Sequence, residues 1–577
     1  MLLPRLWTLA LCGALAACAP LPAMTSAAPA APSAAKESAQ PFVIAANPLA
    51  AKAGMEVLER GGNAADAALA VQTMLSLVEP QSSGVGGGAF LTYFDAATGK
   101  VTIYDGRETA PMQASRTMFL DEGGKPLPFP AAVTSGRATG VPGAVAALAA
   151  LHKDHGALPW HGLFGAAIRT ADEGFVISPR LGRFLGASFP QLSQPDAAAY
   201  FANADGARKK AGDVLKNPDY AAFLTRLSEQ GTEALYRGST AAKIVQRTRA
   251  APFGGTMTME DMAAYRPVKR EPVCNAWAAY RVCAPPPPSS GAAMLELLAL
   301  LDRTDIASRG PKDPQAWYLF AEASRLMYAD RDAYFGDGDF VDVPVKGLLD
   351  PAYIDARAAL IGPKAAMAVT PGKPAGAKVA VLDMTREPAG TSHFIIRDAR
   401  GNVLSITTTV ESIFGTGRMV DGFFLNNQLT DFSFNPLQAD GSEAPNAVAP
   451  GTRPRSSMTP LILLDRQGRF AGAIGSAGGN SILAYVGKTL MASVYWDLPM
   501  QEALAQPNLV ARGRSVGAET DLFDPAVVAG LAERGMVLSP GQGEDSGVHG
   551  VLIREGGRVD GGYDPRREGA VLLGKNP

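Results

Sequence analysis

Apolar residues recur at helical spacing through much of the first part of the chain. The stretch PFVIAANPLAAKAGMEVLERGGNAADAALAVQTMLSLVEP predicts a strand followed by two helices. Pro48 suits the beginning of the first helix, a glycine pair its end, and residues 63–77 have the apolar spacing of the second. Helical patterns also dominate residues 140–250 and 291–332. The first part of the chain is therefore expected to be rich in helices.

From residue 391 onward the pattern changes to short runs of the β type. Six of these runs, separated by turn residues, are TSHFIIRD, NVLSITTTV, GFFLNN, LILLD, FAGAIG and HGVLIRE. A glycine turn at 475–480 precedes one further helix, SILAYVGKTLMASVYW. This sequence of elements favours an α/β fold layered in the order αββα. Residues 365–390, rich in Pro and Gly and weakly patterned, are expected to be exposed.

The segment GTSHFIIRDARGNVLSITTTVESIFGTG, residues 390–417, is the most informative one. Residues 398–402 predict a turn, so the flanking runs should form a β-hairpin. If Arg397 pairs with Val403, Thr391 falls opposite Thr409. Because strand side chains alternate, the face that Thr391 uses would also carry Thr407, Thr409 and Glu411. A slip of one residue would undo this alignment.

The junction Gly390-Thr391 is chemically suited to self-cleavage. A glycine has no Cβ, so its carbonyl group is open to approach and its backbone can adopt strained angles. The Thr391 hydroxyl could attack that carbonyl and shift the acyl group from nitrogen to oxygen. Hydrolysis would then release a new α-amine beside the hydroxyl, as its general base. A Gly-Thr pair alone is weak evidence, since threonine is also a common strand residue.

The first 18 residues have the pattern of a signal peptide. Arg5 supplies a short positive region, and residues 6–17 are apolar but shorter than the about 20 residues that span a membrane. The stretch ends in Leu-Ala-Ala-Cys, which resembles a bacterial lipobox in which Cys18 would be lipidated. The alternative is a soluble periplasmic protein cut near Ala23 or Ala28. We expect export to the periplasm, with an outer-membrane lipid anchor if Cys18 is modified.

Residues 19–40 are mostly Ala, Pro and Ser, and they predict a disordered tether. In an oxidising compartment, Cys274 and Cys283, which flank a predicted hairpin in VCNAWAAYRVCAP, could form a disulfide. Alternatively they are two small buried side chains. Two cysteines alone cannot complete a four-coordinate zinc site, so their role should be structural.

Charge and length limit the class of partner and the architecture. The formal net charge is −2 and no basic block occurs, so nucleic acid is not an expected partner. With 577 residues, the chain should form two or more domains or one large α/β unit.

Nearly the whole chain, from about Val43 to Leu573, resembles the γ-glutamyltransferase family of N-terminal-nucleophile hydrolases. The likeness rests on motifs that occur in the family's order: NPLAAKAGMEVLERGGNAADAALAVQ, EPQSSGVGGGAF, YDGRETAP, GVPGAV, PPPPSSG, YADRDAYFGD, the TSH start, FGTG, LNNQLTDFSF, PRSSMTP, GSAGGN and DPRREG. The resemblance implies a four-layer αββα sandwich. It also implies a large subunit, residues 41–390, and a small catalytic subunit, residues 391–577, produced by self-cleavage.

The resemblance implies a role for each matching residue. Thr391 would be the nucleophile and, with Gly390, the cleavage site, and Thr409 would orient its hydroxyl. Arg107 would clamp the substrate α-carboxylate, because a guanidinium group pairs with a carboxylate through two parallel bonds. The other assignments are Ser456 and Ser457 for the same carboxylate, Gln428 and Asp431 for the α-ammonium, and Gly478 and Gly479 for the oxyanion hole. Taken alone, these could be an ion pair, turn residues and a helix start.

The implied activity is hydrolysis and transfer of γ-glutamyl groups from glutathione or related amides to water, amino acids or peptides, without cofactor or metal. A related acylase acting on glutaryl or β-lactam side chains is one alternative, which Arg107 and Asp431 disfavour. A processed but inactive surface binding protein is another, which Thr391 and the glycine pair at 478–479 disfavour.

Two features depart from the family pattern. Glu411 stands where many members carry Asn, although some bacterial members are acidic there. The loop between Asp431 and Arg455 corresponds to the family's lid, is expected to be shorter than in lid-bearing members, and has no aromatic residue beyond Phe434. We expect a more open site that tolerates larger donors.

Three other signals carry little weight. GVGGGA at 84–89 lacks the strand and helix that a dinucleotide site requires. GRSVG at 513–517, with His549, lies too near the C-terminus for a nucleophile elbow. Solvated side chains, rather than a metal site, are expected of His152, His155 and His161. His393 shares the face of Thr391, without an assigned role.

Overall fold

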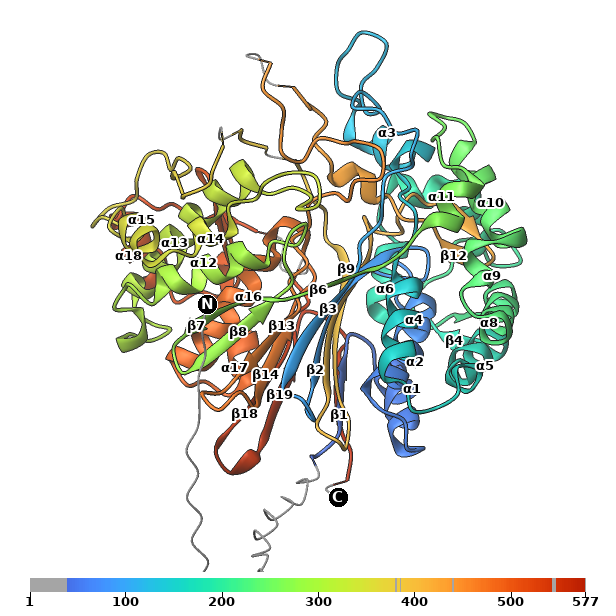
Figure 1. Ribbon diagram of the computed structural model, residues 1–577, viewed down its shortest axis with the longest axis horizontal. Coiled ribbons are helices and arrows are strands. Elements are labelled where there is room, and N and C mark those ends of the chain that lie inside the picture. The colour runs from blue at the N-terminus through green and yellow to red at the C-terminus, as the bar shows by residue number, and fades with distance from the viewer. Residues whose placement is uncertain (1–38, 379–380, 384, 438–440, 542–545, 576–577) are drawn as a thin grey trace, which may run out of the picture. The chain divides into compact units, whose positions relative to one another are not determined.

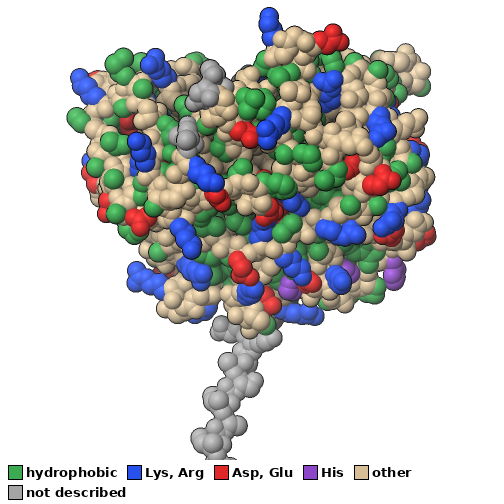
Figure 2. Space-filling view, turned by 45° about the horizontal axis from the view of Figure 1, so that its top comes forward, with side chains coloured by type: hydrophobic (Ala, Val, Ile, Leu, Met, Phe, Trp, Pro, Cys, Tyr) green, Lys and Arg blue, Asp and Glu red, His purple; other side chains and the backbone are tan. Residues whose placement is uncertain are grey.

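The computed structural model describes residues 39–378, 381–383, 385–437, 441–541 and 546–575. The predicted signal peptide, Cys18 and the tether up to residue 38 lie outside the described residues. Within the described part, no helix is long and apolar enough to span a membrane. Side chains of both charge signs are scattered over the face shown in Figure 2.

Two β-sheets face each other at the centre of the fold (Figure 1). In order across the sheet, the seven-stranded one contains β20 (Ala570–Leu573), β1 (Phe42–Ala45), β9 (Gly390–Arg397), β10 (Val403–Glu411), β2 (Gly88–Asp95), β3 (Lys100–Gly106) and β6 (Val268–Arg270). The six-stranded one contains β19 (Val559–Tyr563), β18 (His549–Ile553), β14 (Phe470–Gly475), β13 (Leu461–Leu464), β8 (Tyr280–Ala284) and β7 (Val273–Trp277). The predicted runs at 391–398, 402–410, 461–465, 470–475 and 549–555 therefore contain strands of these sheets, and the run at 422–427 contains β12 (Phe423–Phe424) of a separate two-stranded sheet.

Helices cover the outer face of each sheet (Figure 1). The seven-stranded sheet packs against α1 (Pro48–Glu59), α2 (Ala64–Val78) and α4 (Ala144–His155). The six-stranded sheet packs against α12 (Gly291–Leu301) and α16 (Ile482–Leu490), and α13 (Pro314–Tyr334) packs on α12. A third apolar cluster, including Ile44, Ile395 and Val551, fills the space between the sheets. The predicted αββα layering is confirmed.

Local sequence explains the helix boundaries near the N-terminus. Asn47 caps α1, which begins with Pro48. Asn63 and Asp66 form a reciprocal capping box at the start of α2, which satisfies backbone N–H groups that have no partner inside the helix. These boundaries lie where the proline and the glycine pair predicted them.

The β9–β10 hairpin has the predicted register. Arg397 pairs with Val403, and Thr391 lies opposite Thr409. The pairing then shifts by one residue, so that Glu411 lies opposite Gly390. Glu411 has a φ of 82°, a left-handed conformation that is costly for a residue with a side chain. The hairpin thus ends in a bulge beside the predicted cleavage site.

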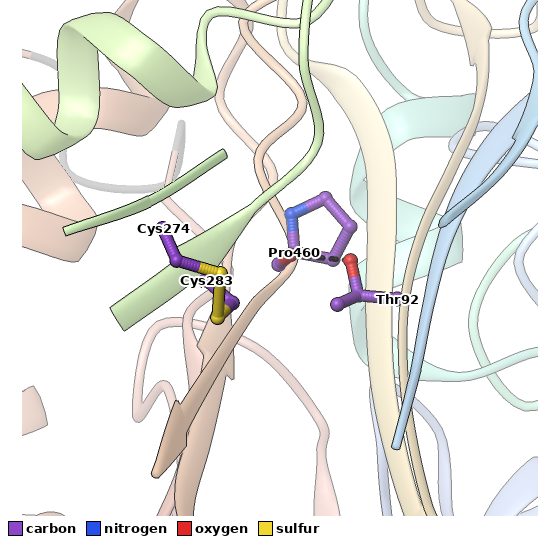
Figure 3. The surroundings of a disulfide bond; sticks show 4 residues. All are labelled: Thr92, Cys274, Cys283 and Pro460. Carbon is purple, nitrogen blue, oxygen red and sulfur yellow. Dashed lines mark hydrogen bonds between the residues drawn. A yellow bond between two sulfur atoms is a disulfide. The ribbon is translucent and has the colours of Figure 1, made fainter. Parts of the chain in front are cut away.

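A disulfide joins Cys274 to Cys283 across the β7–β8 hairpin (Figure 3). Nearby, the Thr92 hydroxyl in the seven-stranded sheet donates a hydrogen bond of 2.7 Å to the Pro460 carbonyl, just before β13. The disulfide therefore links the edge strand β7 to its neighbour β8, and the hydrogen bond of Thr92 connects the two sheets at interior strands.

Replacing both cysteines, as Cys274→Ser/Cys283→Ser, should lower the free energy of unfolding by about 2–3 kcal/mol, because a disulfide restricts the unfolded chain. Urea denaturation followed by intrinsic fluorescence measures the change. Wild-type protein kept under reducing conditions is the control and should resemble the variant. Equal stability of the oxidised wild type and the variant would show that this bond contributes nothing.

Candidate active site

Thr391 lies near the start of β9, where only 3% of its surface is exposed. Its hydroxyl donates to the Thr409 hydroxyl at 3.1 Å. Thr409 in turn donates to the Gly390 carbonyl at 2.7 Å and accepts from the Glu411 backbone N–H at 2.8 Å. The carbonyl of Thr391 accepts a hydrogen bond of 2.8 Å from Arg567. One hydroxyl, that of Thr409, therefore contacts both halves of the Gly390-Thr391 junction.

Only glycine fits at position 390 in this conformation. A Cβ atom there would lie 2.3 Å from the Glu411 carbonyl oxygen and 2.7 Å from that of Ser412. Real Cβ atoms do not approach backbone so closely, so the bulge at Glu411 and the glycine depend on each other.

A small pocket brings together nearly all the residues that the sequence assigned to the site. Its volume is about 20 Å³, room for about one water molecule and too little for an amino-acid head group. The assigned residues that line it are Arg107, Thr391, Thr409, Glu411, Gln428, Asp431, Ser456, Ser457 and Gly479. Glu387, Pro388, Met458 and Ile482 complete the lining, which does not include Gly478.

Three buried acceptor oxygens in this pocket receive no hydrogen bond from a nitrogen or hydroxyl donor in the described residues. They are Glu411 Oε1, Gln428 Oε1 and Asp431 Oδ1. The second oxygen of Glu411 accepts from Ser412 Oγ at 2.8 Å, and the second oxygen of Asp431 accepts from Gln428 Nε2 at 2.7 Å. The pocket therefore holds a cluster of acceptors without enough donors.

Burial raises the pKa of Glu411 well above its ordinary value, and the neighbouring carboxyl of Asp431 raises it further. Burial also raises the pKa of Asp431, although the charge of Arg107 opposes that shift. Two carboxylates this close cannot easily ionise together. The pair therefore shares a proton when nothing else is bound to it.

Arg107 is almost completely buried at the end of β3. Its Nη2 atom donates to Asp431 Oδ2 at 2.6 Å and to the Arg455 carbonyl at 2.7 Å, while Nε donates to the Pro454 carbonyl at 3.1 Å. These contacts fix the plane of the guanidinium group against the start of the PRSSMTP segment. Arg107 is thus held rigidly in the pocket, next to the two serines.

The two serines have different contacts. Ser456 Oγ accepts from the Met458 backbone N–H at 3.1 Å, which is a turn role. Ser457 Oγ donates to the Glu387 carboxylate at 2.6 Å. Arg331 Nη2 donates to the same carboxylate and to Ser457 Oγ, both at 2.6 Å. The Glu387 carboxylate, from the chain itself, therefore binds Ser457, one of the two serines expected to hold the substrate carboxylate.

Gly478 and Gly479 form a turn between β14 and α16, with φ angles of 132° and 52° that favour glycine. A Cβ on Gly479 would lie 2.0 Å from the Glu387 carbonyl oxygen and 2.3 Å from that of Pro388. The segment before Thr391 therefore runs directly over this turn. The expectation that residues up to 390 are exposed is wrong for Glu387, which is buried.

Other residues singled out in the sequence lie elsewhere. His393 is buried between the sheets, with Nδ1 2.9 Å from Thr407 Oγ1, and does not line the pocket. His152 and His155 are not simply solvated, because they contact Asp66 and Tyr104. Among the described residues, no three His, Cys, Asp or Glu side chains form a group suited to a metal ion.

Sequence reasoning did not assign Glu387, Arg331, Arg455 or Arg567 to the site. The three arginines lie within motifs that carry the family resemblance, YADRDAYFGD, PRSSMTP and DPRREG. A buried arginine needs a paired acceptor such as a carboxylate. Each of these motif arginines could therefore have been considered as a residue of the site. Glu387 had no such signal, because its surroundings are weakly patterned.

The loop that corresponds to the lid is anchored at both ends. Phe434 stacks on Phe119 with ring centroids 4.6 Å apart. Asn446 Nδ2 donates to the Asp431 carbonyl at 2.6 Å, and its Oδ1 accepts from the Arg455 backbone N–H at 2.8 Å. The pocket is nearly filled in this uncleaved chain, so the expectation of a more open site stays a prediction about the cleaved protein.

Comparison with known proteins identifies the family of the chain. A family model described as Gamma-glutamyltranspeptidase matches residues 50–574. The chain is 36% identical to the glutathione hydrolase proenzyme of Bacillus subtilis strain 168, over 92% of this chain and 91% of that protein. It is 31% identical to the acylase ACY 1 proenzyme of Pseudomonas sp. strain SE83, over 92% and 93% of the two chains.

Solved structures show the same two relationships. The cephalosporin acylase of Bacillus halodurans superposes with a TM-score of 0.80 at 27% identity, covering 93% of this chain and 96% of that chain. The γ-glutamyltranspeptidase of Helicobacter pylori gives a TM-score of 0.53 at 34% identity, covering 57% and 93%. With the family match over most of its length, the chain belongs to the γ-glutamyltranspeptidase family.

Proposed function

We propose that this protein cuts itself at Gly390-Thr391 and then hydrolyses and transfers γ-glutamyl groups of glutathione or related amides, with Thr391 as nucleophile. The active form would be a heterodimer of residues up to 390 and residues 391–577. The relatives that are named glutathione hydrolase proenzymes support this function. The predicted signal peptide supports a periplasmic location, with Cys18 as the candidate lipid anchor.

The geometry at the junction supports self-cleavage. The Thr391 hydroxyl would attack the Gly390 carbonyl carbon, and charge would develop on the carbonyl oxygen, which already accepts from Thr409 at 2.7 Å. The C–N bond then breaks, and the nitrogen takes a proton to become the α-amine of Thr391. Water hydrolyses the resulting ester, which leaves a carboxylate at Gly390 and frees the hydroxyl.

After cleavage, the same hydroxyl would attack the γ-carbonyl of a donor. The α-amine of Thr391 would accept the hydroxyl proton, and Thr409 would keep the hydroxyl oriented. Gly479 and the preceding Gly478 would donate backbone N–H groups to the oxyanion. The acyl-enzyme would then pass its γ-glutamyl group to water or to an amine.

The cluster of acceptors is the observation that carries the choice of donor. An α-ammonium group has three N–H donors, and the pocket offers it Gln428 Oε1 together with Glu411 Oε1 and Asp431 Oδ1, whose shared proton the ammonium would replace. Arg107 and Ser457 lie in the same pocket to hold an α-carboxylate. An acyl group without the amine would leave Gln428 Oε1 without a donor and would gain nothing from the two carboxyl groups.

The structural similarity to a cephalosporin acylase makes a glutaryl acylase the second candidate. Purified, cleaved protein should therefore be assayed with γ-glutamyl anilide and glutaryl anilide side by side. We expect at least about a hundredfold preference for the γ-glutamyl compound in kcat/KM. Asp431→Asn should remove most of this preference. Preference for the glutaryl compound would identify an acylase, and cleavage of neither would favour an inactive binding protein.

Thr391→Ala should remain a single chain on a denaturing gel, whereas the wild type should give two. Intact-mass measurement should place the wild-type break between Gly390 and Thr391. The matched control is Ser392→Ala, the next residue along the strand and likewise buried, which should still be cut. A Thr391→Ala chain that splits at the same bond would mean that another protease makes the cut.

At a pH where Glu411 and Asp431 share a proton, binding of L-glutamate to the cleaved enzyme should release about one proton, because the ammonium displaces the shared proton. Both carboxyl groups have a raised pKa, so affinity should increase as pH rises through the titration of the pair. Calorimetry in two buffers of different ionisation enthalpy counts the protons.

Glu411→Gln should abolish this release and flatten the pH dependence of affinity. Glu443→Gln, at a surface ion pair with Arg116, is the control and should behave like the wild type. Equal proton release in wild type and Glu411→Gln would contradict the shared proton.

A further inference from the structure

The segment before the junction, residues 385–390, is called the strap here. It is held by Asn480, whose Oδ1 accepts from the Glu387 backbone N–H at 2.7 Å and whose Nδ2 donates to the Thr385 carbonyl at 3.0 Å. The Asn480 backbone N–H donates to the Glu387 carbonyl at 3.2 Å. The strap therefore lies against the turn that precedes α16, over the expected oxyanion hole.

The Glu387 side chain points into the pocket and is only 7% exposed. Its carboxylate accepts from Arg331 Nη2 and Ser457 Oγ, each at 2.6 Å, and lies 3.4 Å from Arg455 Nε. Burial alone would raise the pKa of Glu387, but the charges of Arg331 and Arg455 outweigh burial and lower it to about 2. The pocket thus already contains one fully ionised, bound carboxylate.

Charges around this carboxylate balance only while it is present. Arg331 contacts Asp332 at 3.1 Å, Arg455 lies 3.6 Å from Asp383, and Asp332 is shared with Arg512 at 2.7 Å. Three guanidinium groups therefore face three carboxylates, of which Glu387 is one. Removing Glu387 leaves an excess positive charge in a buried place, which is costly unless another anion replaces it.

We propose that Glu387 is a built-in stand-in for the donor: its carboxylate fills, before cleavage, the subsite of Arg331, Arg455 and Ser457 that receives the donor's α-carboxylate afterwards. This inference rests on the proposed function. Arg331 and Arg455 thereby join Arg107 and the serines as donor-binding residues. The strap also accounts for the pocket of only about 20 Å³, so the uncleaved chain cannot take a donor.

The first test uses chains that cannot cut themselves. Calorimetry should detect no binding of L-glutamate to Thr391→Ala. Binding to Thr391→Ala/Glu387→Ala should be detected, with a dissociation constant at least tenfold below the limit set by the Thr391→Ala measurement. The matched control is Thr391→Ala/Arg386→Ala, which alters the exposed neighbour of Glu387 in the strap and should bind no better than Thr391→Ala. Binding to Thr391→Ala as tight as to the cleaved wild type would overturn the proposal, as would no gain in the Glu387→Ala chain.

The second test needs no variant, in case unpaired arginines prevent the Glu387→Ala chain from folding. The peptide acetyl-Glu-Pro-Ala-Gly reproduces residues 387–390 and should inhibit the cleaved wild-type enzyme competitively with the donor. Acetyl-Gln-Pro-Ala-Gly should be at least tenfold weaker. Equal inhibition by the two peptides, or inhibition by neither, would overturn the proposal.

The two hypotheses fail in different ways. If the cleaved wild type binds L-glutamate and cleaves γ-glutamyl anilide while the strap tests fail, only the role of Glu387 is wrong. If the cleaved wild type does neither, the proposed function is wrong, and the stand-in role falls with it.

Discussion

The register of β9 against β10, with its shift after Thr409, is the constraint on which the site depends. It sets Thr409 opposite Thr391, so that one hydroxyl contacts both the nucleophile and the Gly390 carbonyl. The shift that follows brings the backbone of residues 411 and 412 against Gly390, where only glycine fits. The same bulge turns Glu411 into the pocket. A slip of β10 by one residue would turn Thr409 and Glu411 to the other face of the sheet, away from Thr391 and Gly390.

Burial of charge is the second organising feature, and it links the site to both sheets. Arg107 and Arg331 come from motifs more than two hundred residues apart, and each is buried against a carboxylate in the pocket. Such charges are tolerated only when they are paired and hydrogen-bonded. An ammonium at Asp431 and a carboxylate at Ser457 would leave this pairing intact. On the proposed function, recognition of an amino-acid head group would therefore use the charge balance that the folded chain requires.

Features with local causes could be predicted from the sequence. The hairpin register follows from a short turn and strand alternation, and the helix boundaries follow from Pro48 and Asn63. The position of Glu387 could not, because its partner Arg331 is 56 residues away and its own segment has no periodic pattern. The shift at Glu411 was also missed, since alternation assumes a regular strand. Family motifs supplied the pocket residues, but not which of them contact each other before cleavage.

The closed pocket and the self-cleavage chemistry depend on one another. On the proposed function, the strap must lie across the pocket to present the Gly390 carbonyl to Thr391, and contacts of Glu387 and Asn480 hold it there. Cleavage, on the same proposal, removes the covalent link between Gly390 and Thr391, so the strap is then held only by noncovalent contacts such as those of Asn480 and Ser457. The strap is therefore bound less tightly after cleavage than in the uncut chain. The subsite of Arg331 and Arg455 still requires an anion. Exchange of the strap for a donor then needs no further switch, because the bond that the enzyme cuts is also the one that keeps its own ligand in place.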